Sequence, residues 1–384
     1  MLETLTDPER DAWLVFARAP GLRVEQLLAL IERLGSAPAV LEAGPRAWRE
    51  AGIAEGATEA LSTPDRPRID ADRVWLDATG RTFITILSAA YPPLLRQLLD
   101  APIALFVEGD ATALAAPQLA IVGSRNPTID GRETAEAFAR ALAGCGLTIA
   151  SGLALGIDAA AHRGALAGGG RTIAVLGSGP DIVYPPSHAA LAREIAGRGA
   201  LVSELPPGTP PRREHFPRRN RVISGLSLGT LVVEASDRSG SLITARLATE
   251  QGREVFAIPG SIHNALARGC HRLIREGAKL VETAQDILEE LGPLAGIGSA
   301  VAHTTGPALA GTSPDMPEPD PEYDILLESL GYEAVSIDTL VRRSGLTIEA
   351  VSSMLLILEL RGDVHAVPGG LFARRGPRNP YGST

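Results

Sequence analysis

Six short apolar segments constrain the fold of this chain most. They show little alternation of polar and apolar residues, and most are followed by glycine or serine and then by a segment with helical periodicity. Such strands are typical of a parallel sheet with helices on both faces, joined by right-handed crossovers. We therefore predict an α/β fold over residues 82–291, a Rossmann-like, doubly wound and mostly parallel sheet, extended at one edge by strands near 83–87 and 104–108. The six segments are Leu119–Val122, Leu147–Ala150, Thr172–Leu176, Leu201–Leu205, Thr230–Val233 and Glu254–Ile258.

Three further regions flank this core. Residues 1–75 carry apolar residues at helical spacing between glycine breaks, which predicts a small helical domain of the SAM or helix–hairpin–helix type. Its turns Gly21–Arg23 and Gly52–Ile53 are compatible either with amides that face a phosphate or with plain helical packing. Residues 292–321 have the Gly, Ala, Pro, Ser and Thr content of a flexible linker. Residues 322–384 predict three helices and a two-stranded hairpin, the pattern of a winged helix.

Charge and composition exclude several classes of protein. The net charge is −9, so any binding of nucleic acid must be local rather than spread over the surface. Lys279 is the only lysine and does not follow the glycines of a phosphate loop, which excludes a Walker-type motor. Cys145 and Cys270 provide no disulfide framework, and the histidines have no metal-ligand spacing, so we expect no metal and no cofactor. No segment has the length and apolarity of a signal peptide or membrane span, and we expect a cytoplasmic protein without membrane partners.

Loops rich in glycine and serine follow four of the predicted strands. Ligands of doubly wound sheets bind at the carboxyl ends of the strands, and loops of this kind present backbone amides to phosphates. The first loop adds Arg125, a bidentate cation, although a tight turn with a surface arginine is the alternative. Together the four loops favour a phosphate-rich ligand. The candidate residues are Gly123, Ser124 and Arg125; Ser151 and Gly152; Gly177 and Ser178; and Ser239, Gly240 and Ser241.

Two features of these loops have structural alternatives. Asp158 stands near a helix start, where an acid is favourable by the helix dipole alone, and Asp158 with His162 reads as a pair on the helix surface. No third partner completes a nucleophile and base, so we expect no catalytic residues. Ser239–Ser241 precede a long helical run and either cap that helix or bind an anion.

The segment 211–224 concentrates positive charge around one aromatic ring. Guanidinium groups beside Phe216 match a groove for single-stranded nucleic acid, in which cations follow the phosphates and the ring stacks on a base. The alternative is a solvated surface patch. Asn220 is placed either to bond a base edge or to cap a short helix that begins near Arg221. The arginines are Arg212, Arg213, Arg218, Arg219 and Arg221.

Several of these segments, taken together, resemble the DNA-processing protein A (DprA, also called Smf) family. The resemblance covers roughly residues 118–285 in family order. His188 departs from it, because asparagine is expected there. The matching segments are Gly123–Arg125, Ser151–His162, Phe216–Leu226, Val233–Ala235, Ser239–Ala245 and Phe256–Gly260.

The resemblance implies a function and roles for particular residues. It implies a homodimer that binds single-stranded DNA, protects incoming DNA during natural transformation and loads the RecA recombinase onto it. It implies that Arg125 holds a phosphate, that Phe216 stacks on a base, and that Arg213 with Arg218 or Arg221 lines the groove. It brings no catalytic residues, so the chain is expected not to be an enzyme.

The charge of the winged helix does not favour binding of duplex DNA. Residues 322–375 hold eight acids and five arginines, and the would-be recognition helix at 351–360 is mainly apolar. Reading duplex DNA needs basic and amide side chains, so a protein-contact role is favoured over duplex binding.

The main rival function for the chain is a nucleotide-binding hydrolase of the lysine-decarboxylase-like Rossmann group, whose glycine-rich signature is absent around Pro259. A transcription factor and a structural scaffold are further alternatives.

Overall fold

The computed structural model describes residues 5–295, 321–330, 334–361, 363–367 and 370–374. The chain divides into two compact units, residues 1–302 and 303–384. Most of the linker predicted at 292–321 lies outside the described residues.

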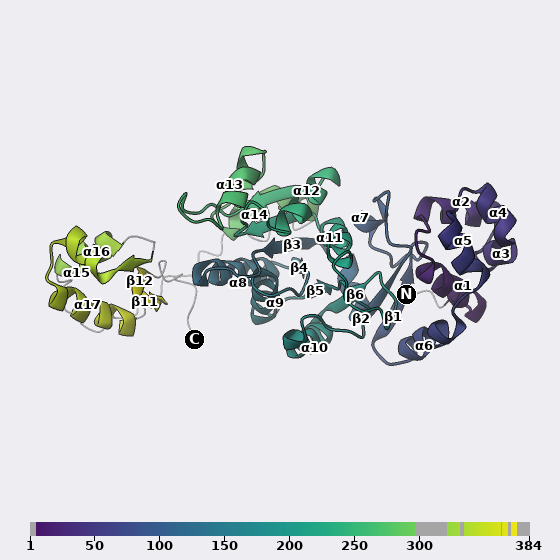
Figure 1. Ribbon diagram of the computed structural model, residues 1–384, viewed down its shortest axis with the longest axis horizontal. Coiled ribbons are helices and arrows are strands. Elements are labelled where there is room, and N and C mark those ends of the chain that lie inside the picture. The colour runs from purple at the N-terminus through teal and green to yellow at the C-terminus, as the bar shows by residue number, and fades with distance from the viewer. Residues whose placement is uncertain (1–4, 296–320, 331–333, 362, 368–369, 375–384) are drawn as a thin grey trace. The chain divides into compact units, whose positions relative to one another are not determined.

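Within the described part of the first unit, nine strands form a single sheet in the order β1-β2-β6-β5-β4-β3-β7-β8-β9 (Figure 1). Strands β3 to β9 pair in parallel, while β1 and β2 pair antiparallel at one edge. The predicted Rossmann-like α/β fold, with short strands at one edge, is confirmed. The strands are β1 (Arg81–Thr85), β2 (Ala104–Gly109), β3 (Gln118–Gly123), β4 (Thr148–Ser151), β5 (Thr172–Val175), β6 (Ala200–Ser203), β7 (Gly229–Val233), β8 (Glu254–Ala257) and β9 (Lys279–Leu280).

The order of the strands reverses at β3. The chain adds β4, β5 and β6 on one side of β3 and then returns to place β7 on the other side. In open α/β sheets such a reversal opens a crevice beyond the carboxyl ends of the strands. The loops after β3, β4 and β7 therefore meet at this position.

Helices cover both faces of the sheet, as the near-continuous apolar strands require. Leu119 and Ile121 of β3 pack toward one layer, while Ala120 and Val122 pack toward the other. Figure 1 shows α8 and α9 on one side and α11, α12 and α13 on the other. The first layer holds α8 (Ile129–Gly144), α9 (Ile157–Ala167), α10 (Ala189–Arg198) and α14 (Ala284–Ala295); the second holds α11 (His215–Leu226), α12 (Ser241–Glu250) and α13 (Arg268–Arg275).

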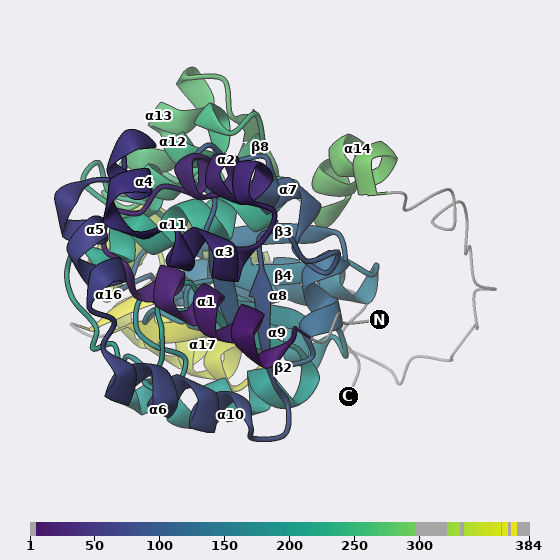
Figure 2. The same ribbon diagram turned by 90° about the vertical axis from the view of Figure 1, so that its right-hand side faces the viewer.

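The N-terminal helices pack beside β1 and β2 and share a hydrophobic core with the sheet. Trp13 and Phe16 belong to the same buried cluster as Phe106 and Val202, so this region and the sheet form one compact unit. Figure 2 looks onto these helices. Side chains of Thr6, Ser36 and Asp65 cap α1, α3 and α6. The helices are α1 (Asp7–Arg18), α2 (Val24–Leu34), α3 (Ala37–Glu42), α4 (Gly44–Glu50), α5 (Glu55–Ser62) and α6 (Arg66–Leu76), followed by α7 (Pro93–Arg96) and the 3₁₀ turns η1 (Ala111–Ala115) and η2 (Pro186–His188).

The second unit is a winged helix, as predicted. Its described residues form three helices and a small antiparallel sheet in the order β10-β12-β11. Leu326, Leu340 and Val351 pack in its core with Leu355 and Val364. The elements are α15 (Pro321–Leu330), β10 (Val335–Ser336), α16 (Ile337–Ser344), α17 (Ile348–Arg361), β11 (Val364–Val367) and β12 (Leu371–Arg374).

Candidate nucleic-acid interface

The end of β3 packs closely against the end of β7 and against the loop after β4. A Cβ on Gly123 would lie 1.9 Å from the carbonyl oxygen of Val233, and one on Gly156 would lie 2.3 Å from that of Ser124. Gly156 also has a φ of +78°, which favours glycine. The amide of Ile157 donates to the Ser124 carbonyl at 3.1 Å. The glycines thus let the backbones approach closely at the strand ends.

Glu234, at the carboxyl end of β7, fixes the loop that carries Arg125. Its carboxylate accepts the amide of Thr128 at 2.8 Å and the Thr128 hydroxyl at 2.5 Å. Thr128 in turn caps α8 by accepting the amide of Gly131 at 3.0 Å. From the sequence, Glu234 was assigned no role of its own, although an acid directly after a buried strand marks a candidate position.

Arg219 lies buried beneath the loop after β4. A Cβ on Gly152 would lie 1.3 Å from its Nη1 atom. The neighbouring carboxylate of Asp158 accepts the amides of Gly152 and Ala154 at 3.2 and 3.3 Å. Burial raises the pKa of Asp158, and burial lowers that of Arg219 to about 10 although Asp158 opposes this. Arg219 is therefore an internal support of the site and not an exposed cation.

Asp158 and His162 do not form the surface pair that their spacing suggested. Both side chains are buried. The Nδ1 of His162 bonds to the hydroxyl of Thr172 at 2.7 Å, while Asp158 bonds to backbone amides. Their spacing correctly placed Asp158 and His162 on one face of α9, but that face packs on the sheet and not toward solvent. The structural interpretation of Asp158 agrees with these bonds.

Phe216 stands in the first turn of α11, directly against the strand ends. The Cζ of Arg125 lies 5.8 Å from the centroid of its ring, within cation–π range. The ring of Tyr184 lies 5.6 Å away on another side, and a Cβ on Gly177 would lie 3.0 Å from the Phe216 ring. Tyr184 is 48% exposed. It was not among the predicted site residues, although an aromatic residue in a strand-end loop is a candidate for stacking on a base. Arg125, Phe216 and Tyr184 together form a partly exposed surface of one cation and two rings.

The arginines of segment 211–224 divide into exposed and engaged groups. Arg212 and Arg213 are exposed. The side chain of Arg218 is 59% exposed and lies 3.3 Å from a carboxylate oxygen of Glu204. Arg221 is 9% exposed, bonds to the same carboxylate, and its Nε lies 3.3 Å from Asp100. Arg221 is thus held inside the fold, while the other three face solvent.

Asn220 lies in the middle of α11, because that helix begins at His215. The predicted alternative that Asn220 caps a helix near Arg221 is therefore wrong. The helix begins six residues before Arg221, and Pro217 lies in its first turn, where proline is tolerated.

The serine hydroxyls of the loops mostly bond inside the protein. Ser151 donates to the carbonyl of Ile121 at 2.7 Å, and Ser178 donates to that of Ile182 at 2.6 Å. The Ser124 hydroxyl accepts the amide of Asn126 at 3.1 Å. These hydroxyls therefore help to shape the loops.

Ser239–Ser241 lie at the start of α12, after β7. Gly240 is the N-cap residue, and the hydroxyls of Ser239 and Ser241 lie 2.7 Å apart. The Ser239 hydroxyl also accepts the amide of Ser241 at 3.3 Å. The first turn of α12 is therefore stabilised locally, at the same sheet edge as Arg125.

These features define a Rossmann-like core with a cationic and aromatic strand-end site, joined to a winged helix. Residues 82–292 match the family model of DNA recombination-mediator protein A, and residues 310–370 match that of the DprA winged helix domain. The chain belongs to the DNA recombination-mediator protein A family. It is 46% identical to protein Smf of Escherichia coli over 312 residues, which are 81% of this chain and 82% of that protein.

Two solved structures are also similar. DNA processing protein A of Streptococcus pneumoniae has a TM-score of 0.66 and 37% identity, over 75% of this chain and 99% of that chain. DNA processing protein A of Helicobacter pylori, solved to show its single-stranded DNA binding mode, has a TM-score of 0.51 and 30% identity, over 56% of this chain and 96% of that one. Among the residues that the structure describes, no helix is long and apolar enough to cross a membrane.

Proposed function

We propose that this chain binds single-stranded DNA at the carboxyl edge of its sheet, without strong sequence preference. The observation that carries the proposal is the placement of the Arg125 guanidinium over the ring of Phe216, with Tyr184 beside it. A ring stacks on any base, and a guanidinium pairs with a phosphate, so this geometry needs no particular sequence. The similar protein of Helicobacter pylori, whose structure was solved for its single-stranded DNA binding mode, supports the same ligand.

The remaining contacts in this proposal come from the exposed side chains and the loop backbone. Arg212, Arg213 and Arg218 extend the positive charge beyond Phe216, and Asn220 follows on the same helix. The backbone amides of the glycine- and serine-rich loops face the sugar-phosphate backbone of the bound DNA strand. Because Arg221 is held by Glu204 and Asp100, we assign it a supporting role.

Fluorescence anisotropy with a labelled thymidine oligomer tests the site. Phe216→Ala is expected to weaken binding by about 1–3 kcal/mol, from lost stacking. Arg125→Ala is expected to lower the salt slope by about 0.7, because one phosphate contact is lost. Arg33→Ala, an exposed arginine on α2, serves as the control. Wild-type affinity and salt slope in both site variants would contradict the assignment.

We further propose that the chain acts without catalysis, as a cytoplasmic homodimer that protects incoming DNA and loads the RecA recombinase during transformation. Family membership supports this. Nuclease protection, sedimentation, and RecA filament formation on strands coated with single-strand-binding protein test the three parts. If incubation with nucleoside monophosphates released free base, the alternative hydrolase of the lysine-decarboxylase-like group would be correct.

For the winged helix we propose contact with a protein rather than with duplex DNA. Leu356 and Ile357 of α17 are 59% and 38% exposed, and α17 stands where a recognition helix would. Apolar side chains cannot make the hydrogen bonds that distinguish most base edges, whereas they do bury against a protein partner. The full chain is expected to bind duplex DNA far more weakly than single strands. Comparable duplex affinity that depended on α17 would overturn this proposal.

A further inference from the structure

A cleft lies beside the strand-end site, within the first compact unit. Its volume is about 1200 Å³, and its two walls come from distant parts of the sequence. One wall is formed by the turn between α1 and α2 and by α6. The other is formed by residues 204–212 and the first turn of α11.

Each wall brings exposed arginines to the cleft. Arg23 and Arg68 line it from the helical side, with side chains 64% and 72% exposed. Arg212 and Arg218 line it from the side of α11, with side chains 63% and 59% exposed. The carboxylates paired with Arg23, Arg68 and Arg212 are exposed, where such pairs contribute little, so phosphates can replace them. Arg218 pairs instead with Glu204, whose side chain is only 6% exposed. Four exposed arginines on one cleft are unexpected in a chain of net charge −9.

The acids that line the cleft are mostly bonded to groups of the protein. Asp65 caps α6 by accepting the amide of Arg68 at 3.3 Å. Asp181 accepts the amide of Gly208 at 2.9 and 3.0 Å, and Glu204 is shared by Arg218 and Arg221. Bonds to these amides and arginines offset much of the repulsion that the acids would exert on a phosphate.

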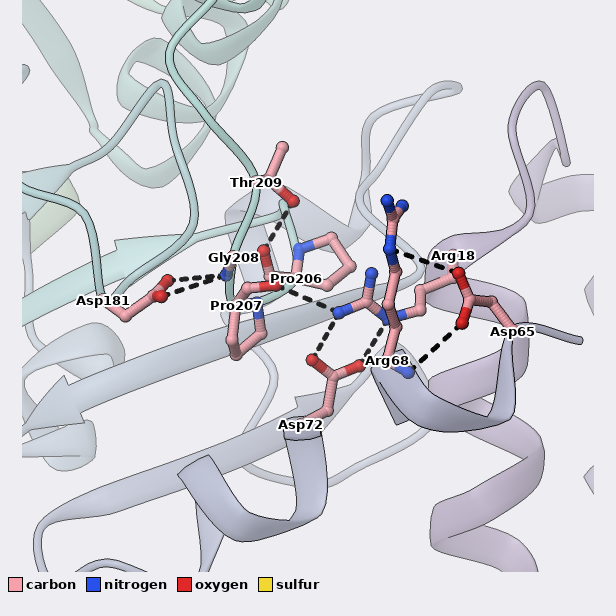
Figure 3. Close-up of polar contacts among 9 residues, drawn as sticks. All are labelled: Arg18, Asp65, Arg68, Asp72, Asp181, Pro206, Pro207, Gly208 and Thr209. Carbon is pink, nitrogen blue, oxygen red and sulfur yellow. Dashed lines mark hydrogen bonds and ion pairs between the residues drawn. The ribbon is translucent and has the colours of Figure 1, made fainter. Parts of the chain in front are cut away.

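Arg18 connects the two walls (Figure 3). It bonds to both carboxylate oxygens of Asp72 at 2.6 Å and donates to the carbonyl of Pro207 at 3.0 Å. Asp72 is fully buried. Arg68 and Asp72 both come from α6, four residues apart (Figure 3). The helical region therefore fixes the segment that leads into α11, and the cleft is a built feature of the fold.

The cleft also offers apolar surface and a turn with free space. Val74 and Leu99 line it and are 72% and 92% exposed. Gly21, with a φ of +75°, lines it at a turn whose sequence is compatible either with a phosphate contact or with plain helical packing. Apolar surface for bases beside arginines for phosphates is the combination that single strands require.

The cleft is continuous with the strand-end site through the first turn of α11. His215 and Arg218 line the cleft, whereas Phe216 between them lies against Gly177 and Arg125. We propose that the cleft is a second contact region for single-stranded DNA and takes the strand that continues beyond Phe216, with Arg23 and Arg68 as phosphate contacts. This inference rests on the proposed function, because it extends the same bound strand.

Oligomers of two lengths test this inference in the full chain. A thymidine oligomer of about six nucleotides is within the size of one single-strand site, roughly 4–16 nucleotides, and one of about 25 nucleotides exceeds it. The Arg23→Ala/Arg68→Ala variant is expected to bind the short oligomer as wild type does and the long one several-fold more weakly. Its salt slope on the long oligomer should fall by about 1.4, for two phosphate contacts.

The matched control is Arg33→Ala/Arg46→Ala, which removes the same charge from exposed arginines of α2 and α4 outside the cleft. Equal effects of the two double variants on the long oligomer would overturn the inference. A fluorophore on Leu99→Cys, in a Cys145→Ala background, adds a direct readout: the long oligomer should change its emission and the short one should not.

The same measurements separate this inference from the proposed function. If the short oligomer does not bind, or binds independently of Arg125, the proposed function fails. If the short oligomer binds through Arg125 but the long one is insensitive to Arg23 and Arg68, only the cleft assignment fails. An acidic protein segment that bound the cleft in place of the long oligomer would also overturn the inference.

Discussion

The guanidinium of Arg219 occupies the space that any side chain on Gly152 would need, since a Cβ there would lie 1.3 Å from Nη1. Arg219 is buried, and its charge is offset by the neighbouring Asp158. This contact joins α11, which carries Phe216, to the loop after β4. The position of the Phe216 ring therefore depends on Gly152, which belongs to a distant segment of the chain.

Gly152→Ala is expected to displace Arg219 and with it the first half of α11. Overpacking of this kind costs about 1–3 kcal/mol, so the urea midpoint should fall, and affinity for a thymidine oligomer should fall as well. Gly144→Ala is the control, because its Cβ would meet nothing within 4 Å. Equal urea midpoints for the two variants would show that Arg219 adjusts without cost.

Arg213 and Arg221 are expected to respond differently to substitution, although they look alike in sequence. Arg213→Ala removes an exposed cation, so the salt slope for single-stranded DNA should fall by about 0.7 while stability is unchanged. Arg221→Ala breaks a buried pair with Glu204, so the free energy of unfolding should fall by about 3 kcal/mol. Urea unfolding and salt titration of both variants check this. A stable Arg221→Ala protein with a reduced salt slope would reverse the assignment.

The difference between Arg213 and Arg221 could not be predicted from the sequence, whereas the strands could. The strands were predictable because buried parallel strands are short, nearly uninterrupted apolar runs. Which arginines face solvent was not predictable, because the partners of Arg219 and Arg221 are Asp158, Glu204 and Asp100, from other segments of the chain.

Two features of the fold were missed for a related reason. Strand β9 has two residues, too few to show a period. The N-terminal helices are also joined to the segment before α11 by Arg18, whose partners Asp72 and Pro207 are distant in sequence. Side-chain pairs between distant segments leave no local pattern, so the cleft that they enclose was not predictable either.

His162 is expected to make stability depend on pH. The Thr172 hydroxyl donates to the carbonyl of Ile149, so it accepts from Nδ1–H of His162, and Nε2 is left without a proton. Burial, with Arg219 adding repulsion, lowers the pKa of His162 from 6.5 to about 3. The unfolded chain therefore binds one proton more than the folded protein between these values, and stability falls as pH falls through this window.

The measurement is urea unfolding between pH 7 and pH 4 for the wild type and His162→Gln. The wild type should lose up to about 1.4 kcal/mol more per pH unit than the variant, since one proton is involved. Parallel curves for the two proteins would show that another group carries the pH dependence.

Substitution of Glu234 is expected to have two opposing effects on DNA affinity, one through its charge and one through its bonds to Thr128. Its carboxylate holds Thr128 and thereby the loop of Arg125. Glu234→Gln removes a negative charge near the proposed DNA site, which by electrostatics alone would tighten binding. Because the charge-assisted bonds to Thr128 weaken, we expect single-stranded DNA affinity to fall instead. Asp237→Asn removes the same charge from an exposed residue after β7 and should leave affinity unchanged or slightly higher. Tighter binding by both variants in an anisotropy assay would show that Glu234 acts only through its charge.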